Sequence, residues 1–248
     1  WPNRIGDGRY SFDGVEHTLA LTEPEKLNAI HGLLRWVPWR CTDRSADAVT
    51  LVATVYPSPG YPFALEAELS YRLGPEGLSV RAAARNVGPT PCPYGFGQHP
   101  YLSGGDGVLV DDCVLQFGAG TRIDTDADRQ LPTADVPVAG TDYDFRAARR
   151  VGPLPVDFAF TDLDRDADGR AWLHLTGPDR RTASLWVDDS VGYLEVFTGD
   201  TLHPDRARRS LGVEPMTCPP NAFQSGRDVI RLAPGGSTAA SWGLALSG

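Results

Sequence analysis

The chain has few cysteines and lacks long apolar runs, and both features narrow its class. Its four cysteines are widely spaced over 248 residues, with no C-x-x-C pair and no Cys/His spacing of a zinc site. We interpret them as buried or incidental free thiols, which favours a reducing compartment and predicts a cytoplasmic protein. No run approaches the ~18 to 20 apolar residues that a membrane helix needs. No membrane partner is therefore expected.

Excess basic charge is also missing. The formal net charge is -9, and the one short basic run, residues 205–209, is offset by acidic residues elsewhere. We expect that run to be a solvated loop. Because a nucleic-acid-binding surface needs a basic stripe, nucleic acid is not expected as a partner.

Several catalytic signatures are absent as well. The sequence has no G-x-S-x-G elbow, no P-loop and no H-E-x-x-H, and Gly95-Phe96-Gly97 lacks the rest of a dinucleotide fingerprint. These absences argue against a serine nucleophile, nucleotide binding and zinc proteolysis. No metal site and no cofactor are predicted.

What the chain does contain is a globular composition broken by turn residues. Hydrophobic residues make up 41%, and 27 glycines and 21 prolines are spread throughout, so helices of ordinary length would rarely fit between them. There is no internal repeat and no shift in composition. We therefore predict one domain spanning residues 1–248.

Short β-rich stretches recur along the chain. Residues 63–73 alternate apolar and polar side chains, and Gly74-Pro75-Glu76-Gly77 follows, which predicts a hairpin to the next strand. Short helical turns are expected only at Pro24–Asn28 and Pro220–Ser225. This spacing of strands and turns predicts an all-β sandwich or barrel. The predicted strands are 9–12, 48–56, 64–73, 78–86, 107–117, 171–176, 183–187, 193–198, 229–232 and 238–246.

Two groups able to transfer protons stand directly before prolines. His99 precedes Pro100 and Glu214 precedes Pro215. A proline biases the preceding residue toward extended backbone, so each group is expected on a stiff strand or loop. The apolar neighbours of Glu214 would raise its pKa toward that of a useful general base if the site is buried. The structural alternatives are a packed histidine and a glutamate on a surface loop.

Two further residues have unusual contexts. His31, like His99, lies in a glycine-containing stretch, where the backbone can approach a ligand closely. Asp157 is a charge inside the apolar run 155–160, and such charges need a partner or a ligand. Trp36 and Trp39 are available to cover an apolar ligand face, although we expect tryptophans to pack in the core.

Six short motifs occur in an order that resembles the aldose 1-epimerase (galactose mutarotase) family. The resemblance runs from the first residues almost to the last. The motifs are Trp1-Pro2-Asn3-Arg4-Ile5 followed by Gly8-Arg9-Tyr10, Asn28-Ala29-Ile30-His31-Gly32, Gly97-Gln98-His99-Pro100-Tyr101-Leu102, Val156-Asp157-Phe158, Leu194-Glu195-Val196-Phe197-Thr198-Gly199 and Glu214-Pro215.

The resemblance implies a large antiparallel β-sandwich whose concave face holds a pyranose sugar. It also implies an isomerase that interconverts the α and β anomers of free aldoses, such as glucose or galactose, by opening and reclosing the ring without a cofactor. By resemblance, Glu214 takes the proton of the C1 hydroxyl and His99 gives a proton to the ring oxygen. Arg4, His31 and Asp157 match sugar-binding positions. Phe197 stands where members often have tyrosine, and so offers a ring face but no hydroxyl.

The acid/base chemistry also suits these residue types. Ring opening removes a proton from one oxygen and adds one to another, and a glutamate with a raised pKa and a histidine held protonated by a nearby carboxylate can both act near neutral pH. Family members usually carry sequence before the Trp1–Arg4 motif, so this chain is expected to lack early strands.

Three other functions stay open. A hexose-6-phosphate mutarotase of the same fold would need cations near the motifs, for which Arg9, Arg35 and Arg40 are candidates. A glycosidase would use Asp157 and Glu214 as its carboxylate pair. A non-catalytic carbohydrate-binding module would not need Glu214 and His99. The preferred sugar and the oligomeric state are left open.

Overall fold

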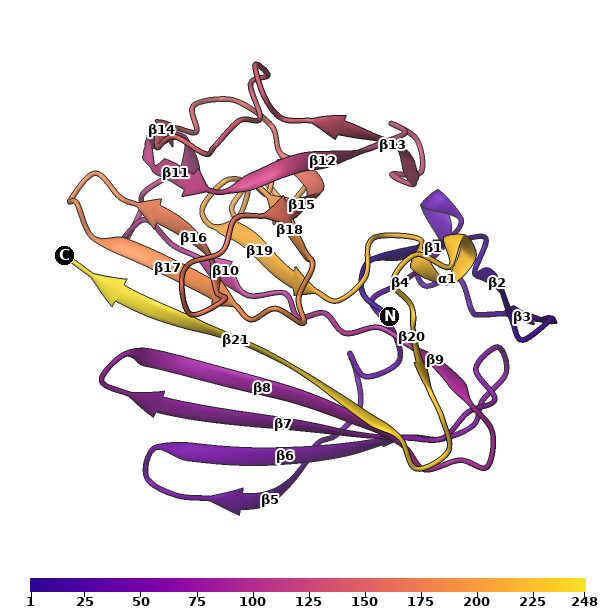
Figure 1. Cartoon of the computed structure of the whole chain (residues 1–248). Coiled ribbons are helices and arrows are strands. Elements are labelled where there is room, and N and C mark those ends of the chain that lie inside the picture. The colour runs from indigo at the N-terminus through magenta and orange to yellow at the C-terminus, as the bar shows by residue number, and fades with distance from the viewer.

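The computed structural model describes residues 1–248 and consists almost wholly of antiparallel strands (Figure 1). Two large sheets lie against each other. The six-stranded sheet has the order β10 (Tyr101–Leu102), β19 (Leu211–Met216), β18 (Tyr193–Phe197), β15 (Asp157–Leu163), β12 (Ala119–Thr125) and β13 (Pro132–Pro137). The nine-stranded sheet has the order β14 (Arg149–Arg150), β11 (Val114–Phe117), β16 (Ala171–Thr176), β17 (Thr182–Val187), β21 (Ser237–Ser247), β8 (Gly77–Asn86), β7 (Leu65–Gly74), β6 (Ala48–Val55) and β5 (Arg40–Arg44).

Three two-stranded sheets lie beside the large ones, on the right in Figure 1. They pair β1 (Arg4–Gly6) with β4 (Asn28–Ile30), β2 (Arg9–Phe12) with β3 (Val15–Thr18), and β9 (Cys92–Tyr94) with β20 (Ile230–Leu232). Helical structure is limited to α1 (Ala222–Ser225) and to 3-10 turns at Pro24–Lys26 and Val110–Asp112. The N-terminal segment thus forms a separate layer at one end of the sandwich.

The main hydrophobic core fills the space between the large sheets. It comprises 27 buried residues contributed by both sheets, among them Leu173 and Leu185 from the nine-stranded sheet and Phe160 and Val213 from the six-stranded one. A second core of 12 buried residues, which includes Tyr10 and Phe223, holds the N-terminal strands against α1 and the ends of the large sheet. Burial of these side chains fixes both layers that meet at the site described below.

The predicted fold class is confirmed: the chain is an all-β protein with large antiparallel sheets. The hairpin around Gly74–Gly77 joins β7 to β8 in full register. The prediction for 107–117 was wrong over its first half, because Val110–Asp112 form a 3-10 turn and the strand starts only at Val114. Strand β19 is buried at every position. Without a polar face it has no alternation, so it was not predicted.

One side-chain expectation was wrong: Trp36 is 85% exposed, because it lies in a loop without a strand to pack it, with the Arg35 guanidinium 5.0 Å from its ring centroid. The basic run 205–209 is a mainly exposed loop, as expected. Its exception is Arg208, which forms ion pairs with Asp111 at 2.8 Å and Asp200 at 2.5 Å. As expected, the cysteines are free: three are buried and Cys41 is exposed.

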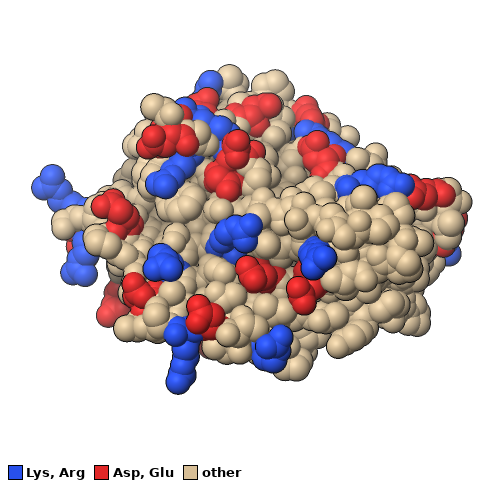
Figure 2. All heavy atoms as spheres, turned by 60° about the horizontal axis from the view of Figure 1, so that its bottom comes forward, with Lys and Arg blue, Asp and Glu red and all other residues tan.

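The outer surface carries mixed charge. Figure 2, which brings the bottom of Figure 1 forward, shows Lys and Arg side chains interspersed with Asp and Glu and no large patch of one sign on this face. No helix is long and apolar enough to cross a membrane.

Candidate active site

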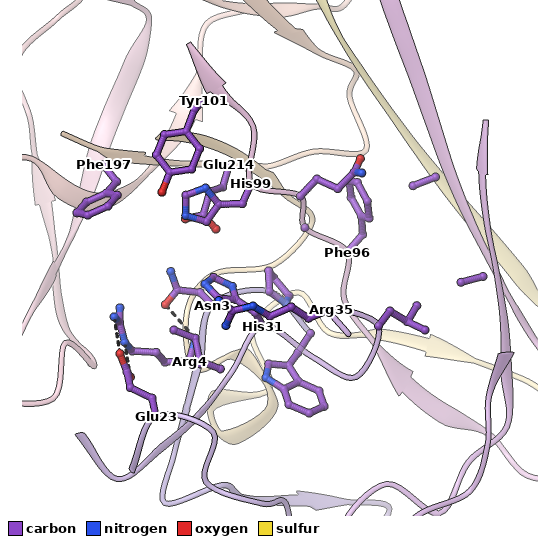
Figure 3. A pocket seen from close by; sticks show the side chains of 18 of the residues that line it. Asn3, Arg4, Glu23, His31, Arg35, Phe96, His99, Tyr101, Phe197 and Glu214 are labelled. Atoms are coloured by element: carbon purple, nitrogen blue, oxygen red, sulfur yellow. Dashed lines mark hydrogen bonds and ion pairs between the residues drawn. The ribbon is translucent and has the colours of Figure 1, made fainter. Parts of the chain in front are cut away.

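A cavity of about 910 Å³ opens where the N-terminal layer meets the two large sheets. All six residues named as site candidates line it: Arg4, His31, His99, Asp157, Phe197 and Glu214. All but Asp157 are labelled in Figure 3, where the labelled residues form two opposed groups. Glu214, His99, Tyr101 and Phe197 lie on one side, and Asn3, Arg4, His31 and Arg35 face them from the other.

Strand pairing places the acidic groups on one face of the six-stranded sheet. Glu214 of β19 lies directly opposite Glu195 of β18, and Phe197 of β18 lies opposite Asp157 of β15. Because side chains two residues apart on a strand share a face, Asp157, Glu195, Phe197 and Glu214 all project toward the cavity side of the sheet. Three adjacent strands thus bring three carboxyl groups together.

His99 reaches Glu214 because its segment runs alongside β19. The Pro215 carbonyl accepts a hydrogen bond from the Gln98 amide at 3.3 Å, and the Pro100 carbonyl accepts one from the Val213 amide at 3.0 Å. Each proline lacks an N–H but uses its carbonyl to join the two segments. As a result, the Nε2 atom of His99 is 3.1 Å from the Oε1 atom of Glu214.

The carboxyl of Glu214 is a weak acid in this setting. Its residue is only 4% exposed. Burial is the main cause that raises its pKa, the nearby charge of Asp157 adds to it, and the Arg4 cation acts in the opposite direction, which together place the pKa at about 8. A carboxyl that titrates near neutral pH can both accept and return a proton during turnover.

Both histidines are held toward the neutral form. Burial lowers the pKa of His31 to about 3, helped by the neighbouring His99 and Arg35. Burial also lowers the pKa of His99. This direction is opposite to the expectation that a nearby carboxylate keeps His99 protonated, because burial outweighs the backbone hydrogen bond that raises the pKa of His99. At neutral pH the proton of the His99–Glu214 pair therefore lies on Glu214.

The opposite group is held by a fixed ion pair. The Arg4 guanidinium donates two hydrogen bonds to Glu23, from Nε at 2.8 Å and Nη2 at 2.9 Å, and Asn28 donates a third to the same carboxylate at 2.9 Å. This bidentate contact orients the guanidinium, which also carries the positive charge that acts on Asp157, Glu195 and Glu214.

His31 owes its place to a left-handed backbone. It follows β4 with φ 59°, and its amide donates to the Asn3 carbonyl at 3.0 Å. The next residue, Gly32, also has a positive φ, and a Cβ there would meet the Trp1 carbonyl oxygen at 3.0 Å. The glycine beside His31 therefore lets the backbone turn and pack closely, which brings the His31 ring within 5.7 Å of the His99 ring.

Three polar residues of the site were missed from the sequence. Glu23 orients Arg4, and Gln130 donates a hydrogen bond to Asp157. Gln98 accepts a hydrogen bond from the Trp242 indole at 2.7 Å and donates one to the Tyr71 hydroxyl at 2.9 Å, which ties the His99 segment to the nine-stranded sheet. Of these three residues, only Gln98 could have been identified from the sequence, because it belongs to the same motif as His99.

Aromatic rings form the apolar walls. Tyr101 stacks on the His99 ring at 4.7 Å between centroids, and Phe197 and Trp39 also line the cavity. Ligand-bearing atoms of His31, His99 and Glu214 lie within 4.8 Å of one another. Within this group the His99 Nε2 and Glu214 Oε1 atoms are 3.1 Å apart.

This architecture is that of the galactose mutarotase-like β-sandwich. A galactose mutarotase-like protein from Clostridium acetobutylicum superimposes with a TM-score of 0.86 at 19% identity, over 99% of this chain and 77% of that chain. Galactose 1-epimerase from Lactobacillus acidophilus gives 0.77 at 20% identity, over 99% and 77% of the two chains.

The family model for aldose 1-epimerase matches residues 1–244, and the chain belongs to that family. It is 36% identical over 236 residues to the uncharacterised protein YihR of Escherichia coli K12, covering 95% of this chain and 73% of YihR. It is 27% identical over 209 residues to aldose 1-epimerase of the same organism, covering 80% of this chain and 58% of that enzyme.

Proposed function

We propose that the protein is a mutarotase that interconverts the α and β anomers of free hexoses such as glucose or galactose. The observation that carries this proposal is the hydrogen-bond distance of 3.1 Å between His99 and Glu214 at a polar cavity. A group with a raised pKa and one with a lowered pKa, in contact, suit a reaction that needs one base and one acid at the same time.

The reaction begins with one proton on the pair. In the reactive form Glu214 is ionised and His99 carries the proton, which is one transfer away from the resting arrangement. Glu214 takes the proton of the C1 hydroxyl while His99 gives its proton to the ring oxygen. The C1–O5 bond then breaks, and the C1 oxygen becomes the carbonyl of an open-chain aldehyde.

Ring closure reverses these transfers. Rotation about the C1–C2 bond presents the other face of the aldehyde to the C5 hydroxyl. His99 takes the proton of that hydroxyl as the C5 oxygen attacks C1, and Glu214 returns a proton to the C1 oxygen. The pair ends with one proton, as it began, and no other co-reactant is consumed.

The remaining residues would hold the sugar. Arg4, His31 and Asp157 supply convergent donors and acceptors for its hydroxyls, and Phe197 offers a ring face. Neutral His31 can donate to one hydroxyl and accept from another. Orientation matters because a hexose must present C1 to Glu214 and its ring oxygen to His99.

Polarimetry tests the proposal. Freshly dissolved α-D-glucose and α-D-galactose should reach anomeric equilibrium faster with the protein than in buffer alone. The protein should be shown to be folded by circular dichroism in the same buffer. Equal rates with and without the folded protein, for both sugars, would disprove a free-hexose mutarotase.

One observation favours a second candidate, a hexose-6-phosphate mutarotase. Of the three arginines considered for a phosphate, only Arg35 lines the cavity. No ion pair engages its guanidinium, which rests over the Trp36 ring. An unpaired cation at a sugar cavity can bind an anionic substituent. A much higher kcat/KM for glucose 6-phosphate than for glucose, lost in Arg35→Gln, would support this alternative.

A further inference from the structure

Glu195 is a buried carboxyl that takes no part in the proposed proton transfers. It lies on β18 directly opposite Glu214 of β19, and the two are the only buried acidic residues of the chain, at 3% and 4% exposed. The Oε2 atom of Glu195 has no hydrogen-bond partner. Since buried carboxylates are normally paired, Glu195 either carries an uncompensated charge or holds a proton.

The charges around Glu195 disfavour ionisation. Directly opposed Cβ atoms in an antiparallel pair are about 4.5 to 5.5 Å apart, and diagonal neighbours about 7 to 8 Å. Glu214 occupies the opposed position, and Asp157 of β15 the diagonal one, two residues from Ala159, which pairs with Glu195. The cation that acts on Glu195 is Arg4, whose guanidinium is already bound by Glu23.

Burial and the two neighbouring carboxyls accordingly raise the pKa of Glu195 well above its ordinary value. If Glu195 were ionised, its charge would also raise the pKa of Glu214. A charge this close typically moves a carboxyl pKa by about 1 to 3 units. The pKa of Glu214, already about 8, would then lie well above the neutral range, and Glu214 could not ionise readily enough to act as a base.

We propose that Glu195 keeps its proton while Glu214 gains and loses one, so that the neutral Glu195 carboxyl allows its cross-strand neighbour to ionise. Glu195 does not line the cavity. It is a positioning residue that acts through Glu214. The effect on catalysis rests on the proposed function, whereas the protonation of Glu195 does not.

Infrared spectroscopy tests the protonation without any substrate. Above pH 8, where Glu214 is ionised, the wild-type protein should still show the C=O stretch of a buried protonated carboxyl. The band should persist in Glu214→Gln and vanish in Glu195→Gln. Its absence from both the wild type and Glu214→Gln would overturn the proposal, and these two proteins decide the matter even if Glu195→Gln does not fold.

The pH profile of kcat/KM tests the influence on Glu214. Glu195→Gln, a neutral isostere, should keep kcat/KM within about threefold of wild type and its ascending limb within about 0.3 pH unit. Glu195→Leu, which removes the polar group, should move that limb to higher pH because Glu214 becomes less solvated.

Two outcomes of that experiment would contradict the proposal. An ascending limb that moves by a unit or more to lower pH in Glu195→Gln would mean that Glu195 is ionised in the native protein. Identical pH profiles of kcat/KM for the Gln and Leu variants would show that Glu195 contributes only packing. If no aldose is turned over at all, the proposed function fails, while the infrared result still decides whether Glu195 is protonated.

Discussion

Gly212 lies against the His99 ring with no room for a side chain. A Cβ at Gly212 would stand 3.1 Å from the Cε1 atom of His99 and 3.4 Å from both the Phe197 Cβ and the Tyr101 ring. Gly212 is two residues before Glu214 on the same face of β19, so the strand that carries Glu214 also leaves space for the His99 ring.

Gly212→Ala should therefore reduce catalysis more than stability. The new methyl group displaces the His99 ring by a few tenths of an ångström, and we expect kcat/KM to fall by about 10-fold to 100-fold, since small misplacements of reacting groups have effects of this size. Polarimetry measures the change. Gly74→Ala is the matched control, because a Cβ there meets nothing within 4 Å and should leave activity intact. Wild-type activity in Gly212→Ala would show that His99 tolerates displacement.

Glu214→Gln should abolish turnover and preserve sugar binding. The amide keeps the shape of the side chain but cannot take the C1 proton, and loss of a general base costs about 10²-fold to 10⁴-fold in rate. Polarimetry measures the rate, and isothermal titration calorimetry the affinity for the sugar. Glu66→Gln, at an exposed position of β7, should behave as wild type. Retained turnover in Glu214→Gln would remove Glu214 from the role of base.

His31 should make the folded protein sensitive to acid. Its pKa is about 3 in the folded protein against a usual 6.5, so between these values the unfolded chain binds more protons. This contribution to stability is fully present above pH 6.5 and is lost as the pH falls toward 3. We expect the melting temperature to drop less from about pH 7 to about pH 5 in His31→Asn than in wild type.

The control for that measurement is His203→Asn, whose side chain is 79% exposed. Its melting temperatures should follow those of the wild type across the same pH range. If His31→Asn loses as much stability in acid as the wild type does, the imidazole of His31 is not buried in its neutral form.

Arg4→Gln should shift the pH dependence of activity as well as weaken sugar binding. Arg4 favours the ionised form of Glu214, so its removal should raise the pKa of Glu214 and move the ascending limb of kcat/KM to higher pH. Initial rates by polarimetry across the pH range measure the limb. Arg231→Gln, whose side chain is 51% exposed and paired with Asp13, serves as control. An unmoved limb would show that Arg4 has no electrostatic effect on Glu214.

The sequence carried the local features of the site but not its pairings. A proline after His99 and after Glu214 indicated extended backbone at both, and the ordered motifs indicated their roles. The Arg4–Glu23 contact has no local pattern, because it joins β1 to a residue just before the Pro24–Lys26 turn.

Strand register accounts for most of what could not be predicted. Glu195 was visible in the sequence as part of a motif, but its position opposite Glu214 depends on how β18 pairs with β19. The alternation of apolar and polar residues predicted β7, which has one solvent-facing side. Strand β19 is buried throughout, so its sequence shows no such alternation. The cluster of Asp157, Glu195 and Glu214 results from the pairing register of β15, β18 and β19, which the sequence does not reveal.

The cavity is built from two parts of the chain that can vary separately. Arg4, His31 and Arg35 come from the N-terminal layer, whereas His99 and Glu214 lie opposite them (Figure 3). Glu214 and Asp157 stand on the six-stranded sheet, and His99 lies beside it. On the proposed function, substitutions within residues 1–35 can therefore alter which sugar is held while His99 and Glu214 stay unchanged. A scaffold divided in this way lets the bound ligand change without disturbing the two groups proposed to transfer protons.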